Sequence, residues 1–207
     1  MPRRNAGHFC FINTYNLITI HLLPYFVSQL VYFWLNQNLK TMQVNFLIVL
    51  LTALVPMVMG FIWYNPKVLG TAWMNAAGIT EDKMKGANMA VIFGVSFVLS
   101  FFLAMSMQFM VIHQWSFFSI LANEPGMKDP NSEIGMYVKD FMEKYGHNFR
   151  TFKHGAFHGT IGGFMIALPI LGTNALFERK GFKYIAINCG YWIITMAIMG
   201  GILCQFS

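Results

Sequence analysis

The sequence predicts an all-α fold, an integral membrane bundle of four transmembrane helices in two antiparallel hairpins. Of the 207 residues, 56% are hydrophobic and only 11% are charged, whereas soluble domains usually carry about 25% charged residues. Four uncharged stretches are each long enough to cross a hydrocarbon core of about 30 Å. A brief connection joins the first stretch to the second, and another joins the third to the fourth. Short connections favour antiparallel packing of the helices that they join.

The first two predicted spans cover residues 44–62 and 87–112. The first reads VNFLIVLLTALVPMVMGFI, and its proline predicts a kink near Thr52–Pro56, since proline cannot donate a backbone hydrogen bond. Before the second span, Thr80 resembles an N-cap, with acidic residues in the turn that follows. We therefore expect the second helix to begin at Glu81 and to project beyond the lipid.

The third and fourth predicted spans cover residues 155–177 and 184–205, joined by a brief turn. The third places three glycines on one helical face, at intervals of four: Gly155, Gly159 and Gly163. Small residues allow the backbones of membrane helices to approach closely. This face is expected to pack against another helix, either in the same chain or in a homodimer.

The main polar connection covers residues 114–153 and separates the two hairpins. Within it, residues 134–145 read IGMYVKDFMEKY, with apolar residues at helical spacing and charged residues between them. This pattern predicts a short amphipathic helix on the membrane surface.

The N-terminal residues 1–41 form an extension to a membrane domain at residues 42–207. Its segment Phe9–Leu35 is weakly hydrophobic but is interrupted by polar residues and a proline, so a fifth helix is left open. No small-residue cleavage site follows a compact apolar core, so a signal peptide is not predicted. The strong first span begins just after Met42, which suggests that the extension is dispensable or not native.

The formal net charge of +6 does not indicate nucleic-acid binding. The basic residues lie in the connections rather than along one face, as expected for topology signals and lipid-headgroup contacts. The predicted partner is therefore the lipid bilayer, with a homo-oligomer or another membrane protein left open. The three cysteines, Cys10, Cys189 and Cys204, fit neither a disulfide framework nor a CxxC metal site.

His154 and His158 are the strongest candidates for a functional pair. They lie four residues apart, so their rings share one helical face, a spacing that suits two metal ligands. His113 or His147 could supply a third ligand. Hydrogen bonding to headgroups or to neighbouring backbone is the favoured interpretation, because two histidines without a carboxylate or cysteine partner are a weak metal signal. No cofactor is predicted, and the metal remains the alternative.

A second candidate region follows the first span, where Trp63, Tyr64 and Trp73 flank a polar connection. Aromatic side chains of this kind favour the membrane interface, so anchoring is the preferred interpretation. A small-ligand pocket and a role in bracing the connection are the alternatives.

The stretch GFIWYNPKVLGTAWMNAAGIT resembles the signature of the family called domain of unknown function 1761. That signature joins two short motifs, here Gly60, Trp63, Tyr64 and Pro66, then Gly70, Trp73 and Met74. The stretches HGAFHG and FERKGFKYIAINCGYW are also similar to the family, so the resemblance covers roughly residues 42–207. It implies a small bacterial membrane protein without an established activity, and no catalytic residues can be carried over from it. The expected location is the bacterial inner membrane, with several membrane-spanning segments.

The leading functional hypothesis is a noncatalytic membrane protein that binds a small molecule, a lipid or another membrane protein, in a transport-associated or assembly role. The four predicted spans contain no charged side chain, which argues against a carboxylate-driven pump. An interfacial metalloenzyme using His154, His158 and His113 is the second hypothesis. The third is a small-solute transporter or channel, which would have to oligomerise because four helices enclose little space.

Overall fold

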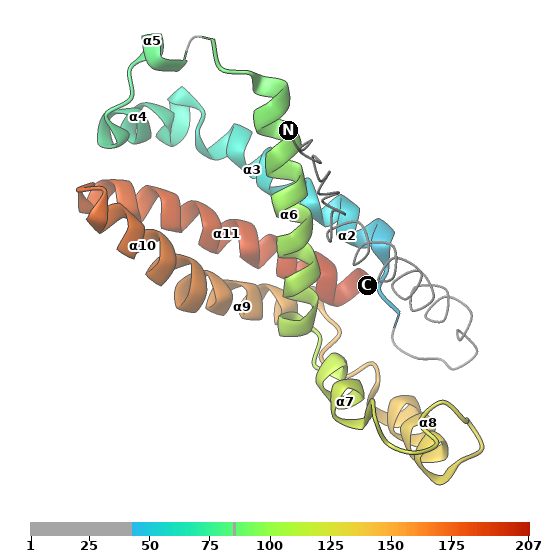
Figure 1. The fold of residues 1–207 in the computed structure, drawn as a ribbon. Coiled ribbons are helices and arrows are strands. Elements are labelled where there is room, and N and C mark those ends of the chain that lie inside the picture. The colour runs from blue at the N-terminus through green and yellow to red at the C-terminus, as the bar shows by residue number, and fades with distance from the viewer. Residues whose placement is uncertain (1–42, 85) are drawn as a thin grey trace, which may run out of the picture. The chain divides into compact units, whose positions relative to one another are not determined.

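The computed structural model describes residues 43–84 and 86–207, and every regular element in these residues is a helix (Figure 1). The helices are α2 (Phe46–Ala53), α3 (Val55–Trp63), η1 (Pro66–Gly70), α4 (Thr71–Ala77), α5 (Glu81–Met84), α6 (Met89–Val111), α7 (Gln114–Leu121), α8 (Glu133–Tyr145), α9 (Phe152–Gly162), η2 (Gly163–Ala167), α10 (Leu168–Phe177) and α11 (Phe182–Phe206). The predictions for residues 1–41, including the fifth span, lie outside the described residues.

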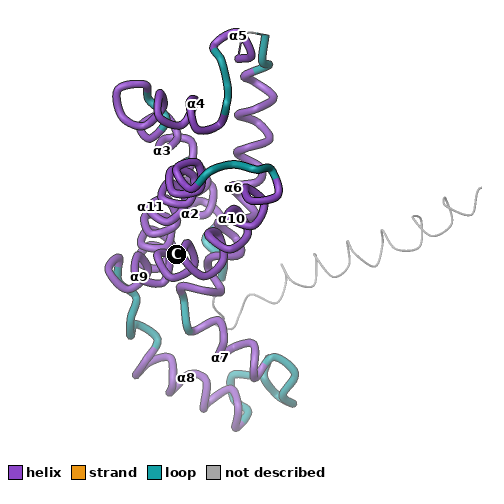
Figure 2. Tube along the Cα trace, turned by 90° about the vertical axis from the view of Figure 1, so that its left-hand side faces the viewer, coloured by secondary structure: helices purple, strands orange, loops and turns teal. Residues whose placement is uncertain are grey.

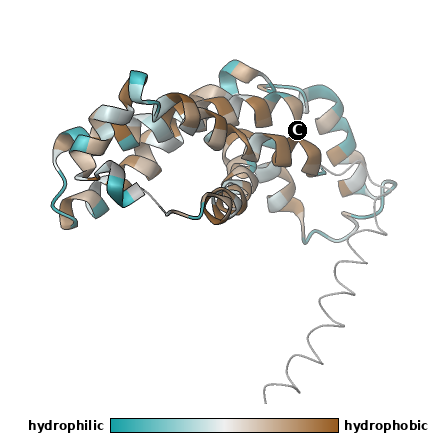
Figure 3. Ribbon diagram, turned by 90° about the horizontal axis from the view of Figure 1, so that it is seen from above, coloured by the Kyte–Doolittle hydropathy of each residue, from teal (hydrophilic) through white to brown (hydrophobic). Residues whose placement is uncertain are grey.

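Four helical segments are long and apolar enough to cross a membrane, so the predicted four-helix membrane bundle is confirmed. They are Phe46–Trp63, Met89–Val111, Phe152–Phe177 and Phe182–Phe206. Large apolar side chains remain exposed along them, for example Leu47 at 64% and Leu99 at 62%. Figure 3 shows the hydrophobic colour along these helices and the hydrophilic colour at the connections. An apolar outer surface of this extent is suited to lipid.

The first span is interrupted where the sequence predicts a kink. The helix breaks at Leu54, and α3 begins at Val55 with Pro56 in its first turn. Proline supplies no N–H to the preceding turn, and its ring crowds a carbonyl group there. The predicted kink near Thr52–Pro56 is therefore confirmed.

The second span begins later than expected, and the prediction of one helix from Glu81 is wrong. α5 is a single short turn, and Gly86 then adopts a left-handed φ of 86°. α6 begins at Met89, where the side chain of Asn88 accepts a hydrogen bond from the N–H of Val91 at 3.2 Å. The left-handed glycine and the new cap separate the two helices.

The third span contains a π-helical turn, η2, between α9 and α10. Pro169 lies in the first turn of α10, and a widened turn before a proline accommodates its ring and its missing N–H. The span begins at Phe152, one turn before the predicted start at residue 155. Both predicted helices of this hairpin are present with small shifts at their ends.

Helix α11 is the centre of the bundle. It contacts α9, η2 and α10 of the third span, and also α2, α3 and α6. Figure 1 shows the third span and α11 side by side as a hairpin, with α6 crossing them obliquely. Fully buried side chains at the centre include Val49, Ala104, Val111, Met199 and Leu203. Packing on α11 therefore holds the two hairpins together.

The polar connection contains the predicted helix α8 and also α7, which the sequence analysis did not predict. Figures 1 and 2 show α7 and α8 at one end of the helical bundle and α4 and α5 at the other. The rings of Phe117 and Phe141 stack with centroids 4.1 Å apart, which joins α7 to α8. Ser132 caps α8, since its hydroxyl oxygen accepts a hydrogen bond from the N–H of Gly135 at 3.0 Å.

Candidate metal centre

The predicted glycine face brings α9 into backbone contact with α11. A Cβ atom added at Gly155 would lie 2.1 Å from the carbonyl oxygen of Gly200, and one at Gly159 would lie 2.0 Å from that of Met196. A Cβ at Gly163 would also meet α11, at 2.6 Å. These positions leave no room for a side chain. The face therefore serves packing within the chain, so these glycines are not available to a second copy.

His154 and His158 occupy the neighbouring face of α9. Four residues further along that face, a Cβ at Gly162 would lie 2.6 Å from the terminal methyl carbon of Met110 on α6. The histidine-bearing face is therefore turned toward α6. Thr151 begins α9, and its hydroxyl oxygen accepts a hydrogen bond from the N–H of His154 at 3.3 Å. This cap places the first histidine in the first turn of the third span.

His113 reaches the same place from the end of α6. The extended backbone of Ile112, with φ −115° and ψ 98°, ends α6. The side-chain amide of Gln114 then donates hydrogen bonds to the carbonyl oxygens of Gly146 at 3.1 Å and Asn148 at 3.0 Å. These bonds tie the α6–α7 junction to the residues that precede α9, and His113 is thereby held beside the start of α9.

The three histidine rings form a compact triangle. The ring centroid of His113 lies 4.9 Å from that of His154 and 4.8 Å from that of His158, and the latter two are 4.5 Å apart. The Nε2 atoms of His113 and His154 are 2.9 Å apart, and one nitrogen of each ring lies within 4.8 Å of the others. Of the two candidates for a third ligand, the structure therefore brings in His113, whereas His147 is outside the cluster.

The nitrogen spacing suits a single four-coordinate metal ion. Zinc binds imidazole nitrogen at about 2.0–2.1 Å, so two nitrogens on one tetrahedral ion lie roughly 3.3 Å apart. This separation falls between the 2.9 Å of the closest pair and the 4.8 Å limit of the cluster. Small ring rotations would bring all three nitrogens onto one ion. The 2.9 Å contact also suits a hydrogen bond between one protonated and one unprotonated ring nitrogen.

Aromatic residues lie beside the three histidines. The ring centroid of Phe149 lies 5.1 Å from that of His154, and the ring centroid of Phe157 lies 5.7 Å from that of His158. Neither the sequence from 86 to 123 nor that from 144 to 177 contains Asp or Glu. The sequence on either side of the three histidines therefore supplies no carboxylate to the cluster.

The aromatic residues of the motif lie at the other end of the bundle, where α3 leads into η1. Trp63 donates its indole N–H to the carbonyl oxygen of Ile187 at 3.1 Å, and a Cβ at Gly190 would lie 3.2 Å from its ring. The Tyr64 hydroxyl donates to the side-chain oxygen of Asn188 at 2.9 Å. Both aromatic residues thus anchor the end of the first span on α11, which supports the bracing role.

The remaining motif residues shape the turn that follows. A Cβ at Gly70 would lie 2.2 Å from the carbonyl oxygen of Tyr64, so the π turn Pro66–Gly70 can close only with glycine at its end. The Trp73 ring packs edge-on against that of Tyr64, with centroids 5.2 Å apart. Gly60 and Met74 are half-buried on α3 and α4. The motif therefore has a structural explanation without a ligand.

The bond between Tyr64 and Asn188 is expected to contribute about 1 kcal/mol to stability. Burial, reinforced by neighbouring tyrosines, raises the pKa of Tyr64, so its phenol stays protonated and donates. Tyr64→Phe and Asn188→Ala should each lower the free energy of unfolding in detergent, and the double variant should cost less than the sum of the two. Strictly additive costs would show that the two side chains are not coupled.

Sequence reasoning missed the partners of these features on α11. Gly190 packs against the ring of Trp63, and Gly200 packs against the backbone of Gly155. Neither glycine belongs to a repeated spacing in the sequence that would have predicted these contacts. Asn188 is one of the few polar residues in the predicted fourth span, as Gln108 is in the second, and this polarity is a signal that the sequence does carry. Gln108 is buried, with its side-chain oxygen lacking a hydrogen-bond partner among the described residues.

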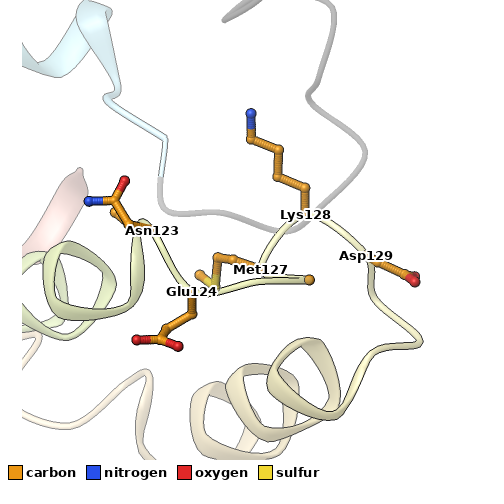
Figure 4. Close-up of a pocket in the computed structure, with 7 residues that line it drawn as sticks. Asn123, Glu124, Met127, Lys128 and Asp129 are labelled. Atoms are coloured by element: carbon orange, nitrogen blue, oxygen red, sulfur yellow. The ribbon is translucent and has the colours of Figure 1, made fainter.

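A shallow hollow of about 370 Å³ lies in the loop between α7 and α8. Figure 4 shows that the side chains of Asn123, Glu124, Lys128 and Asp129 point in different directions rather than toward a common centre. All lining residues come from one surface loop, 122–129, so we assign no binding role to the hollow.

Comparison with protein families gives a match over residues 47–204 to the family described as "Protein of unknown function (DUF1761)". The match includes the motif of the first connection and all three clustered histidines. Comparisons with curated proteins and with solved structures gave no match. Since the match covers most of the chain and confirms the resemblance carried by the motif, the chain belongs to the DUF1761 family.

Proposed function

We propose that this chain is a multi-pass protein of the bacterial inner membrane that binds one divalent transition-metal ion at a membrane surface, without itself catalysing a reaction. The ligands are His113, His154 and His158. The observation that carries the proposal is that these three rings lie together, although His154 is 41 residues after His113 in the chain. His158 lies on the same helix as His154.

The third ring, that of His113, favours a metal site over simple hydrogen bonding of the histidines. From sequence alone, His154 and His158 are a pair without a definite partner. The geometry adds His113, and three imidazoles are a common ligand set for zinc. Imidazole also suits copper, nickel and iron, whereas magnesium and calcium prefer oxygen ligands. The proposed ion is therefore a first-row transition metal, with zinc as the first choice.

A binding role is favoured over an enzymatic one. Hydrolytic zinc sites usually place a glutamate or another base beside the metal-bound water. In the part of the chain that the structure describes, the candidate metal group consists of histidines alone. The proposal accordingly retains the noncatalytic hypothesis and supplies its ligand.

Zinc binding should be measured on the full chain, purified in maltoside detergent without a polyhistidine tag. Native mass spectrometry and calorimetry are expected to give one zinc per chain. The double variant His154→Ala/His158→Ala should lose this zinc, because only one ligand of the cluster remains. His147→Ala is the matched control and should bind as the wild type does, since His147 is exposed and outside the cluster. A metal-free wild type, or a double variant that keeps the zinc, would refute the proposal.

A further inference from the structure

We infer that the metal held by His113, His154 and His158 takes a phosphate oxygen as its outer ligand, from either a lipid headgroup or free phosphate. The inference rests on the proposed metal site and goes further, because it names the chemistry of the remaining coordination position. The charge of the site, its depth in the membrane and its accessibility all favour this ligand.

The charge of the site calls for an anion. Three neutral imidazoles leave the double positive charge of the ion uncompensated, and a zinc ion with three protein ligands keeps a fourth position open. The nearest ionisable residues along the chain, Arg150 and Lys153, are basic. Arg150 donates a hydrogen bond to the backbone carbonyl of Ser207, so its charge is directed to the end of α11. The balancing charge must therefore come from outside the cluster.

The depth of the site places it among lipid phosphates. The third span has 26 residues, which corresponds to a helix of roughly 39 Å against a hydrocarbon core of about 30 Å. Its ends therefore extend into the headgroup layers. His154 lies in the first turn of this span, and His113 lies two residues beyond the end of α6. The exposed Lys153 beside them adds to the attraction for anionic headgroups.

The site is accessible from the membrane surface. His113 is exposed, whereas His154 and His158 are half-buried against the bundle. Phe149 and Phe157, which flank the rings, have 64% and 62% of their surfaces exposed. Their apolar faces suit contact with lipid beside a phosphate bound to the metal. An outer ligand can therefore approach the cluster from its exposed side, where His113 lies.

The test uses cobalt(II) in place of zinc, because it is paramagnetic and relaxes a bound phosphorus nucleus. The full chain is loaded with cobalt in maltoside, which contains no phosphorus, and loading is followed by the visible absorption of cobalt. Phosphorus-31 NMR then monitors either inorganic phosphate or a short-chain phosphatidylglycerol. Unbound cobalt is removed by desalting before phosphate or lipid is added. Zinc-loaded protein provides the diamagnetic baseline, and His154→Ala/His158→Ala, treated with cobalt and desalted in the same way as the wild type, provides the control for unspecific contact.

Broadening of the phosphorus line with the cobalt protein, absent from both controls, is the expected result. Broadening of phosphatidylglycerol alone would assign the ligand to the lipid, and broadening of inorganic phosphate alone would assign it to the free anion. If the site loads with cobalt but neither line broadens, the inference fails and the metal-binding proposal stands. If cobalt does not bind at all, both fail.

Discussion

Replacing Gly159 by valine is expected to destabilise the bundle strongly, whereas the same replacement at Gly172 is expected to be tolerated. A Cβ at Gly159 would lie 2.0 Å from the carbonyl oxygen of Met196, so α9 and α11 would have to separate. At Gly172, in the same span, the nearest atom is a methyl carbon of Ile185 at an ordinary 3.8 Å. We expect Gly159→Val to cost about 3 kcal/mol or more, at or above the upper end of overpacking costs.

The pairing of glycines across this interface leaves no way to relieve the clash. A Cβ at Gly200 on α11 would itself lie 2.4 Å from the carbonyl oxygen of Gly155, so both backbones are already at contact distance. Thermal or denaturant unfolding in maltoside, followed by circular dichroism, measures the difference. The change in helix propensity from glycine to valine is the same in both variants and cancels between them. Equal stability of the two variants would show that α9 and α11 can separate at little cost.

The sequence predicted features that depend on local chemistry. The four spans follow from uninterrupted apolar sequence, the kink follows from Pro56, and α8 follows from apolar residues at helical spacing in Glu133–Tyr145. The glycine face of the third span was also recognisable, because intervals of four residues repeat along one side of a helix.

Features that depend on tertiary contacts were not predictable in the same way. Helix α7 reads QWSFFSIL, which lacks the periodic polar positions of an amphipathic helix, and its place is set by Gln114 bonding to residues before α9. The helix predicted from Glu81 was interrupted by the backbone of Gly86. The partners of the glycine face and of Trp63 lie on α11, whose sequence carries no periodicity that would single them out.

The candidate metal site was predicted only in part, for the same reason. His154 and His158 share a face because of helix geometry, which sequence spacing reveals. The choice of His113 over His147 depends on the extended backbone of Ile112 after α6 and on the packing of α6 against α9, which spacing does not reveal. The sequence therefore predicts two ligands, His154 and His158, and the third, His113, is added by packing between the two hairpins.

His113→Ala is expected to abolish the stabilisation of the bundle by zinc. His113 follows the second span, and the other two ligands belong to the third, so the ion would link α6 to α9. At a zinc concentration 100-fold above the dissociation constant, binding should stabilise the wild type by about 2.7 kcal/mol. Loss of one of three direct ligands should weaken binding by at least about 100-fold, since loss of an indirect partner alone costs 10–100-fold. The stabilisation would then fall to about 0.4 kcal/mol or less.

The measurement is the unfolding temperature in maltoside with zinc and with a chelator, for wild type, His113→Ala and His147→Ala. His113 is exposed and makes no capping hydrogen bond to α7, and its 2.9 Å contact with His154 is also exposed. Losing that contact should cost little, so the chelated variant should unfold close to the wild type. His147→Ala should keep the full response to zinc, because this side chain is also exposed but lies outside the cluster of His113, His154 and His158. A full response in His113→Ala would mean that the ion is held within α9 alone, and that zinc does not join the two hairpins.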